Sequence, residues 1–240
     1  MTFYSKVAVI TGAYGGLGKS LARQYLDNGY DLCLIGRNRD KLIELSKSLR
    51  ERAPSSMIRT YDCDFGDKYW IKNVCKKIST DVKKVDVLIN AAAVFPVSSM
   101  EDMHLADFET CMQVNVIAPF VIMQQLLDSL KKSDNGKIIN IASSSAYGGG
   151  PNTSAYCASK HALLGLSRSL FKELRSDGIK VFCVSPGSIQ TDMGKEVEKL
   201  GQVYDTFMTP EEVSEYIFSA TSFEGHMISE EIRLNRVFVQ

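Results

Sequence analysis

The chain has 240 residues, enough for one large domain or two small ones. Apolar residues make up 45% of it and charged residues 23%, which is typical of a folded globular protein and argues against disorder. The 28 Lys and Arg residues balance the 28 Asp and Glu residues, which argues against a protein that binds nucleic acid. No Cys-x-x-Cys pair occurs, and the histidines are far apart in the sequence, so we expect reduced thiols and no metal site.

Two further expectations concern the location of the protein. No stretch approaches the roughly 18 apolar residues that a membrane-spanning helix needs. The short apolar run near the N-terminus does not have the form of a secretion signal. We therefore expect a cytoplasmic protein with no membrane partner.

Short runs rich in Val and Ile alternate along the chain with longer stretches of helical spacing. The runs cover residues 7–10, 32–35, 85–89, 137–141 and 179–184. Uninterrupted apolar runs of this length are typical of strands buried on both faces of a parallel sheet. This order predicts a single α/β domain over residues 1–240, with a Rossmann-like, doubly wound parallel sheet whose carboxyl edge binds ligands.

The helical stretches also have recognisable ends and faces. Asn38 is the expected N-cap of a helix that follows the second strand. Two long helices are expected around residues 107–130 and 154–175, the second ending near Gly178. Each has an apolar stripe on one face, formed by Phe108, Met112, Val116 and Phe120 in the first and by Ala162, Leu166, Leu170 and Leu174 in the second.

A glycine-rich loop, TGAYGGLG over residues 11–18, directly follows the first strand. Glycines let the backbone approach a pyrophosphate, and the N–H groups of the following helix face its charge. The spacing of Gly12, Gly16 and Gly18 differs from the common G-x-G-x-x-G pattern, and a nucleoside-triphosphate P-loop would need glycine at Ala13. The strand–loop–helix context favours a dinucleotide, with the P-loop and a purely structural turn as alternatives.

The end of the second strand indicates which dinucleotide binds. NAD sites usually place a carboxylate there for the ribose hydroxyl, whereas this strand is followed by Arg37. A guanidinium can pair with a 2′-phosphate and stack on adenine, so we predict NADP(H). A solvated arginine at a helix start is the alternative.

The candidate catalytic residues are Ser143, Tyr156, Lys160 and Asn115. Tyr156 and Lys160 are four residues apart on one helix face, where an ammonium is expected to lower the pKa of the phenol. Ser143 follows a strand at the ligand edge and can donate to a substrate carbonyl. Pro119 deprives the Asn115 carbonyl of its helical partner, and we expect a water there that links Lys160 to solvent. An ordinary proline kink is the alternative.

These motifs resemble the short-chain dehydrogenase/reductase family over nearly the whole chain. The matching positions are Thr11, Gly12, Gly16, Gly18, Arg37, Asp64, Phe65, Asn90, Asn115, Ser143, Tyr156, Lys160, Pro186, Gly187 and Thr191. The resemblance implies hydride transfer between NADP(H) and a carbonyl or alcohol substrate. It makes Tyr156 the general acid/base and Ser143 the group that holds the carbonyl oxygen. Lys160 would lower the Tyr156 pKa and bind the nicotinamide ribose, and the segment from Pro186 to Thr191 would hold the carboxamide.

The chain also departs from the family pattern. Ala91 and Ala93 replace an amide and a glycine, and Tyr14 stands where NADP-preferring members often have a basic residue. The segment 191–209 is short for a substrate lid. We include Tyr14, Leu17 and Ala91 in the expected cofactor site, and the resemblance suggests Phe95, Tyr147, Asn152, Ser188 and Met193 as substrate-pocket walls.

Two expectations concern partners and the alternative function. Similar proteins pair their long helices across a two-fold axis, so we expect a homodimer or homotetramer, with the apolar tail 236–240 docking on a neighbour. The alternative to an enzyme is a non-catalytic NADP(H)-binding sensor or scaffold.

Overall fold

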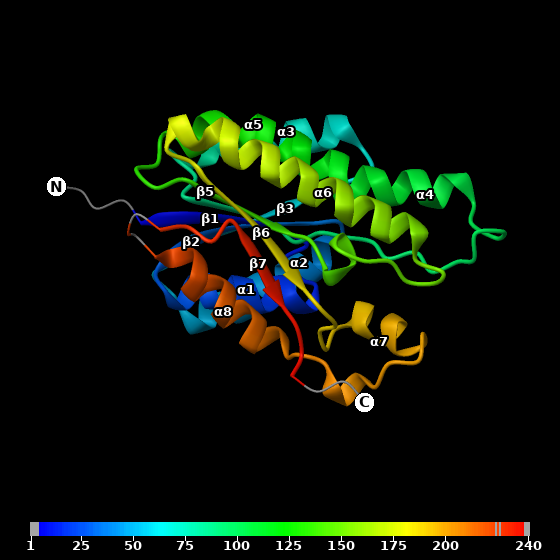
Figure 1. Cartoon of the computed structure of the whole chain (residues 1–240). Coiled ribbons are helices and arrows are strands. Elements are labelled where there is room, and N and C mark those ends of the chain that lie inside the picture. Colours follow the sequence, from blue (N-terminus) through cyan, green and yellow to red (C-terminus); the bar gives the residue numbers. More distant parts are fainter. Residues whose placement is uncertain (1–4, 224, 226, 238–240) are drawn as a thin grey trace.

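The computed structural model describes residues 5–223, 225 and 227–237, so residues 238–240 of the tail that was expected to dock on a neighbour lie outside the described residues. Within them, seven parallel strands form one sheet in the order β3-β2-β1-β4-β5-β6-β7 (Figure 1). The strands are Lys6–Thr11 (β1), Tyr30–Gly36 (β2), Ile58–Asp62 (β3), Val87–Asn90 (β4), Lys137–Ile141 (β5), Lys180–Pro186 (β6) and Glu231–Leu234 (β7). The strand order reverses between β1 and β4, which opens a crevice at the carboxyl edge.

Helices cover both faces of the sheet (Figure 1). One face carries α1 (Gly16–Asp27), α2 (Arg39–Arg52) and α8 (Pro210–Ser222); the other carries α3 (Lys68–Asp81), α4 (Leu105–Met112), α5 (Ala118–Lys131) and α6 (Ser154–Glu173). The helix α7 (Asp192–Glu198) lies in the connection from β6 to α8. Short 3-10 turns cover Ser144–Ala146, Leu174–Asp177 and Tyr204–Thr206.

The predicted doubly wound α/β fold is confirmed. All five predicted strands are present because alternate side chains of each enter the two buried layers; Val7 and Val9 of β1 face one layer, and Ala8 and Ile10 the other. Asn38 caps α2 as predicted, accepting a hydrogen bond from the Lys41 N–H at 3.0 Å.

Two strands, β3 and β7, were not predicted. They form the two edges of the sheet, and neither is an uninterrupted apolar run. Edge strands keep polar side chains where central strands are apolar, so a search for continuous Val and Ile runs misses them.

The apolar stripe predicted for the first long helix does not face the core. Its inner side instead carries Cys111, Val114, Ala118, Val121 and Ile122, all buried. A π-helical turn at Gln113–Ile117 joins α4 to α5, and its extra residue rotates the two halves relative to each other. Of the first stripe, Phe120 is 43% exposed, while Phe108 is partly buried against a small core cluster. Of the second stripe, Leu174 is buried, and Leu166 and Leu170 are partly buried against the core.

The segment Leu105–Lys131 contradicts one sequence-based expectation. It forms 27 continuous helical residues, long and apolar enough to pass a test for a membrane span. Half of its apolar window is buried inside the fold, however, and α5 packs against α3. This burial is the pattern of a core helix in a globular α/β protein.

Gly18 provides a test of the glycine loop. A Cβ at this position would lie 2.1 Å from the Gly12 carbonyl oxygen, so Gly18→Ala must displace the backbone of the turn. We expect the free energy of unfolding in urea to fall by about 1–3 kcal/mol. The matched control is Gly148→Ala, where a Cβ would meet open space. Equal stabilities of the two variants would contradict this role of the loop.

Candidate active site

A cavity of about 630 Å³ lies along the carboxyl edge of the sheet. Most of the predicted site residues line it, namely Gly12, Tyr14, Gly16, Leu17, Gly18, Arg37, Asp64, Phe65, Ala91, Ser143, Tyr156, Lys160, Pro186, Gly187 and Thr191. Thr11, Asn90 and Asn115 do not reach the cavity and lie behind its wall. Among the described residues, no cluster of His, Cys, Asp and Glu side chains could hold a metal ion.

Thr11 joins two segments that lie beneath the cavity. Its buried hydroxyl accepts hydrogen bonds from the N–H groups of Ala91 at 3.0 Å and Ala92 at 3.1 Å. Gly12 has φ +64°, and a Cβ there would lie 2.8 Å from the Ala92 Cα. The end of β1 and the chain after β4 are therefore in close contact, and the turn requires glycine at position 12.

The first turn of α1 is suited to an anion. It begins at Gly16 with no side-chain cap and no acidic residue in the first turn, so its N–H groups lack an acceptor side chain. Thr191 packs against Gly16, where a Cβ would lie 2.5 Å from the Thr191 methyl carbon. The Thr191 hydroxyl also accepts from the Gly194 N–H at 3.1 Å and so caps α7. The first turn of α1 and the start of α7 are thereby joined.

Arg37 and Tyr14 form the far end of the cavity. The Tyr14 ring covers Gly36, where a Cβ would lie 2.5 Å from a ring carbon, and its hydroxyl accepts from the Asn38 N–H at 3.2 Å. Within the described chain the exposed Arg37 side chain has no hydrogen bond or ion pair. A free guanidinium beside an uncapped helix start fits a dinucleotide with a phosphate on its adenosine ribose.

On the opposite wall of this end, Asp64 accepts a hydrogen bond from the Gly66 N–H at 2.9 Å. The Gln113 amide donates to the Phe65 carbonyl at 3.3 Å. Gln113 therefore ties the loop after β3 to the helix that carries Asn115. The sequence offered no sign of this contact, because the partners are 48 positions apart.

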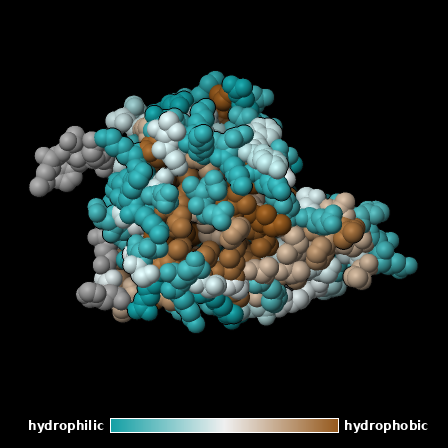
Figure 2. Space-filling view, turned by 90° about the horizontal axis from the view of Figure 1, so that it is seen from above, coloured by the Kyte–Doolittle hydropathy of each residue, from teal (hydrophilic) through white to brown (hydrophobic). Residues whose placement is uncertain are grey.

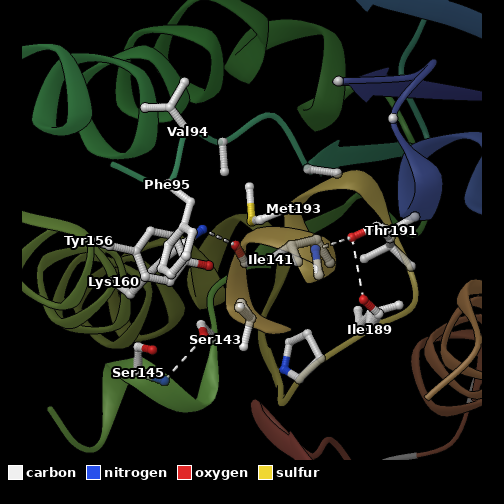
Figure 3. A pocket seen from close by; sticks show the side chains of 18 of the residues that line it. Val94, Phe95, Ile141, Ser143, Ser145, Tyr156, Lys160, Ile189, Thr191 and Met193 are labelled. Atoms are coloured by element: carbon white, nitrogen blue, oxygen red, sulfur yellow. Dashed lines mark hydrogen bonds between the residues drawn. The ribbon is translucent and has the colours of Figure 1, made fainter. Parts of the chain in front are cut away.

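Tyr156 and Lys160 lie on one face of α6, as predicted, and both are buried. The Lys160 Nζ donates to the Ile141 carbonyl at 2.9 Å and lies 5.4 Å from the centre of the Tyr156 ring (Figure 3). This hydrogen bond fixes α6 to the end of β5. It places Tyr156 beside the loop that begins with Ser143.

The predicted depression of the Tyr156 pKa is not found. Burial raises the pKa of Tyr156 to about 12, and a hydrogen bond with Ser143 opposes this rise. Burial also lowers the pKa of Lys160 to about 8. Burial removes the phenolate and the ammonium from water, and this cost outweighs the attraction between the two charges on which the prediction depended.

Ser143 and Phe95 complete the surroundings of the Tyr156 hydroxyl. The Ser143 hydroxyl accepts from the Ser145 N–H at 3.1 Å, which holds its side chain at the start of the 3-10 turn (Figure 3). The Phe95 ring meets the Tyr156 ring edge to face, with centres 4.7 Å apart. Two hydroxyls thus converge beside an apolar wall, a setting for proton transfer to a carbonyl oxygen.

Asn115 supports this arrangement from behind. Its side chain accepts from the Val94 N–H at 2.9 Å and donates to the Val94 carbonyl and the Ser159 hydroxyl, both at 3.0 Å. It therefore joins the segment that carries Phe95 to the helix that carries Tyr156. A π-helical turn over Gln113–Ile117 lies just before Pro119, and a water on the Asn115 carbonyl stays a prediction.

The substrate end agrees only in part with the expected walls. Phe95, Ser188 and Met193 line the cavity, whereas Tyr147 and Asn152 do not. The Tyr147 hydroxyl donates to Glu231 at 2.8 Å, and its ring stacks on Arg233, which holds it outside the cavity. Further wall residues that the sequence did not reveal are Val94, Pro151, Thr153, Val197, Leu200 and Gln202.

The burial of Lys160 leads to a testable prediction about how the stability of the protein depends on pH. With a folded-state pKa of about 8 against an ordinary 10.5, the ammonium is buried at a cost that is fully present below pH 8. Between pH 8 and pH 10.5, Lys160 is neutral in the folded protein but still protonated in the unfolded chain. The destabilisation caused by burying its charge therefore decreases as pH rises through this range. We expect the stability gain of Lys160→Met over wild type to be about 2 kcal/mol smaller at pH 9.5 than at pH 7 in urea denaturation. A difference independent of pH would contradict this environment for Lys160.

Comparison with known proteins agrees with this geometry. The family model of the short chain dehydrogenases matches residues 6–200. An uncharacterized oxidoreductase of Thermotoga maritima is 34% identical over 80% of this chain and 74% of its own length. A 3-oxoacyl-(acyl-carrier-protein) reductase of Rickettsia conorii is 30% identical over 96% of this chain and 95% of its own.

Solved structures show the same architecture. An alcohol dehydrogenase from the archaeon Thermococcus sibiricus, complexed with 5-hydroxy-NADP, superposes with a TM-score of 0.88 at 25% identity, covering 98% of both chains. A putative short chain dehydrogenase from Escherichia coli CFT073, complexed with NADPH, gives 0.87 at 25% identity over 96% of this chain and 95% of the other. On the family match and these relatives, the chain belongs to the short-chain dehydrogenase family of oxidoreductases.

Proposed function

We propose that this protein is an NADP(H)-dependent oxidoreductase that interconverts a carbonyl and a hydroxyl group on a small molecule. The observation that carries the proposal is the convergence of Ser143, Tyr156 and Lys160 in the cavity that also holds the glycine loop. The glycine loop and the three catalytic residues belong to a single domain. NADP(H), when bound, supplies or accepts the hydride.

The residues of the chain manage the proton. With a pKa raised to about 12, Tyr156 carries its proton at neutral pH and is ready to donate it to a carbonyl oxygen. The Ser143 hydroxyl donates a hydrogen bond to the same oxygen and holds it in place. The Lys160 ammonium then stabilises the phenolate that forms, because opposite charges attract strongly when both are buried. In the reverse direction the Tyr156 phenolate accepts the proton from the alcohol.

The choice of cofactor rests on Arg37. Its free guanidinium lies in the same cavity as the uncapped start of α1. The two features are complementary to a 2′-phosphate and to a pyrophosphate respectively. Complexes of structurally similar proteins with NADPH and 5-hydroxy-NADP support the same choice.

The alternatives receive no comparable support. A sensor or scaffold would not need an intact Ser143, Tyr156 and Lys160 set, and the relatives named above are oxidoreductases. A P-loop would need glycine at position 13, where this chain has Ala13. The Ala13 side chain is fully buried in one of the two apolar layers that flank the sheet.

We also propose that the protein is a homo-oligomer in the cytoplasm, a dimer or tetramer. Figure 2 shows hydrophobic side chains gathered on the face formed by the helices above the sheet. Ile117 is 44% exposed and Phe120 43%, and Leu166 and Leu170 of α6 are only half-buried. A second copy would cover such an apolar face. The six cysteines are free thiols, which fits a reducing compartment.

The role of Tyr156 is tested by Tyr156→Phe, which removes the proton and keeps the ring. We expect kcat/KM for reduction of ketones and aldehydes to fall by about 10²–10⁴, because general acid catalysis is lost. The Kd for NADPH, measured by fluorescence titration, should stay within about threefold of wild type. Turnover by the variant at the wild-type rate would refute the proposed chemistry, and NADPH binding by a wild type that reduces no carbonyl compound would favour the sensor.

The role of Arg37 is tested by Arg37→Leu. Loss of a charge-assisted hydrogen bond to phosphate should raise the Kd for NADPH about tenfold or more and leave the Kd for NADH unchanged. Arg39→Leu is the control, since Arg39 is an exposed residue of the same segment that does not line the cavity. Equal weakening of both cofactors by Arg37→Leu would remove Arg37 from phosphate recognition.

A further inference from the structure

Gln202 stands at the substrate end of the cavity, in the segment between α7 and the 3-10 turn Tyr204–Thr206. Its amide oxygen accepts two hydrogen bonds. One comes from the Ser188 hydroxyl at 2.9 Å, and the other from the Arg236 guanidinium at 3.0 Å. Ser188 lines the cavity beside it.

These partners fix which way the amide points. A guanidinium can only donate hydrogen bonds, so the atom facing Arg236 must be the amide oxygen. The Nε2 group is therefore directed away from Arg236 and Ser188. In the described part of the chain, Nε2 of the half-buried Gln202 has no hydrogen-bond partner. The two N–H donors of this wall residue are therefore left without a partner in the described chain.

Arg236 is itself held in place. It donates to the Thr206 hydroxyl at 2.8 Å, and its guanidinium lies 5.2 Å from the centre of the Phe207 ring. Both partners belong to the same connection between α7 and α8 as Gln202. The residue just after β7 thus fastens this segment and orients the amide before any substrate arrives, which lowers the entropic cost of using it.

The remaining walls of this end describe the rest of the substrate. Phe95, Met193, Val197 and Leu200 are apolar, and Thr153 is polar. The charged residues that line the cavity are Arg37, Asp64, Lys160 and Asp192. Arg37 and Asp64 lie at the dinucleotide end, Lys160 is hydrogen-bonded behind Tyr156, and Asp192 pairs with Lys195 in solvent. In the described chain, none of the cationic side chains that line the cavity is placed to bind an anionic substrate.

We propose that Gln202 is a specificity-determining residue that donates a hydrogen bond from Nε2 to a second oxygen of an uncharged, largely apolar carbonyl substrate. Arg236 is the positioning residue that sets the orientation of the amide. The proposal rests on the proposed function, and it narrows the substrate class to ketones or aldehydes with a further carbonyl, hydroxyl or ether oxygen.

The test compares substrates with and without the second oxygen. Purified wild type is assayed with NADPH on cyclohexanone and on ring diketones whose second oxygen stands at increasing distances from the first. We expect the best diketone to exceed cyclohexanone in kcat/KM by about tenfold, the value of one well-placed hydrogen bond. Gln202→Leu should abolish this preference, with the loss appearing in KM for the diketone more than in kcat. Gln202→Met, a second apolar variant, should behave in the same way.

The controls separate recognition from a folding defect. Gln190→Leu changes a glutamine of the same connection that does not line the cavity, and it should retain the preference. Arg236→Leu should lose the preference, and Arg236→Lys should restore part of it, because a lysine can still donate to the amide oxygen. A wild type without preference for any diketone, or an equal loss of activity on all ketones in both Gln202 variants, would overturn the inference alone. Failure of wild type to reduce any ketone or aldehyde would instead overturn the proposed function.

Discussion

The site depends on one buried hydrogen bond, from the Lys160 ammonium to the Ile141 carbonyl. A lysine that is 2% exposed is expensive to bury, and its charge is tolerated because a backbone carbonyl at the end of β5 receives it. The bond joins the helix that carries Tyr156 to the strand that leads to Ser143. The same contact that anchors α6 therefore brings the two hydroxyls of the proposed reaction together.

A second layer of buried polar groups supports the cavity from behind. The Thr11 hydroxyl joins β1 to the chain after β4, and Asn115 joins the Phe95 segment to α6. Neither side chain touches the cavity, so their contribution is to the position of the walls. Buried, satisfied polar groups of this kind specify one arrangement because any displacement leaves a donor or acceptor without a partner.

The sequence predicted much of this and missed the rest for physical reasons. Central strands, the glycine loop and the pair Tyr156 and Lys160 are local patterns, and they were predicted correctly. The edge strands lack continuous apolar runs, and the π-helical turn shifts a helix phase that regular spacing assumes. Tyr147 was misplaced because Glu231, 84 positions away, holds its hydroxyl. Gln202 depends on Arg236 in the same long-range way. The predicted direction of the Tyr156 pKa shift was wrong because the pKa is raised by burial, which is a property of the folded chain.

We infer that the cavity holds a dinucleotide so that its hydride meets a carbonyl carbon beside Tyr156. The most direct measurement follows the hydride itself. NADPH carrying deuterium on one face of the nicotinamide ring is used to reduce a ketone, and the alcohol is analysed by mass spectrometry and NMR. We expect one deuterium on the carbinol carbon when one face is labelled and none when the other is labelled. Alcohol without deuterium from either labelled form would contradict it.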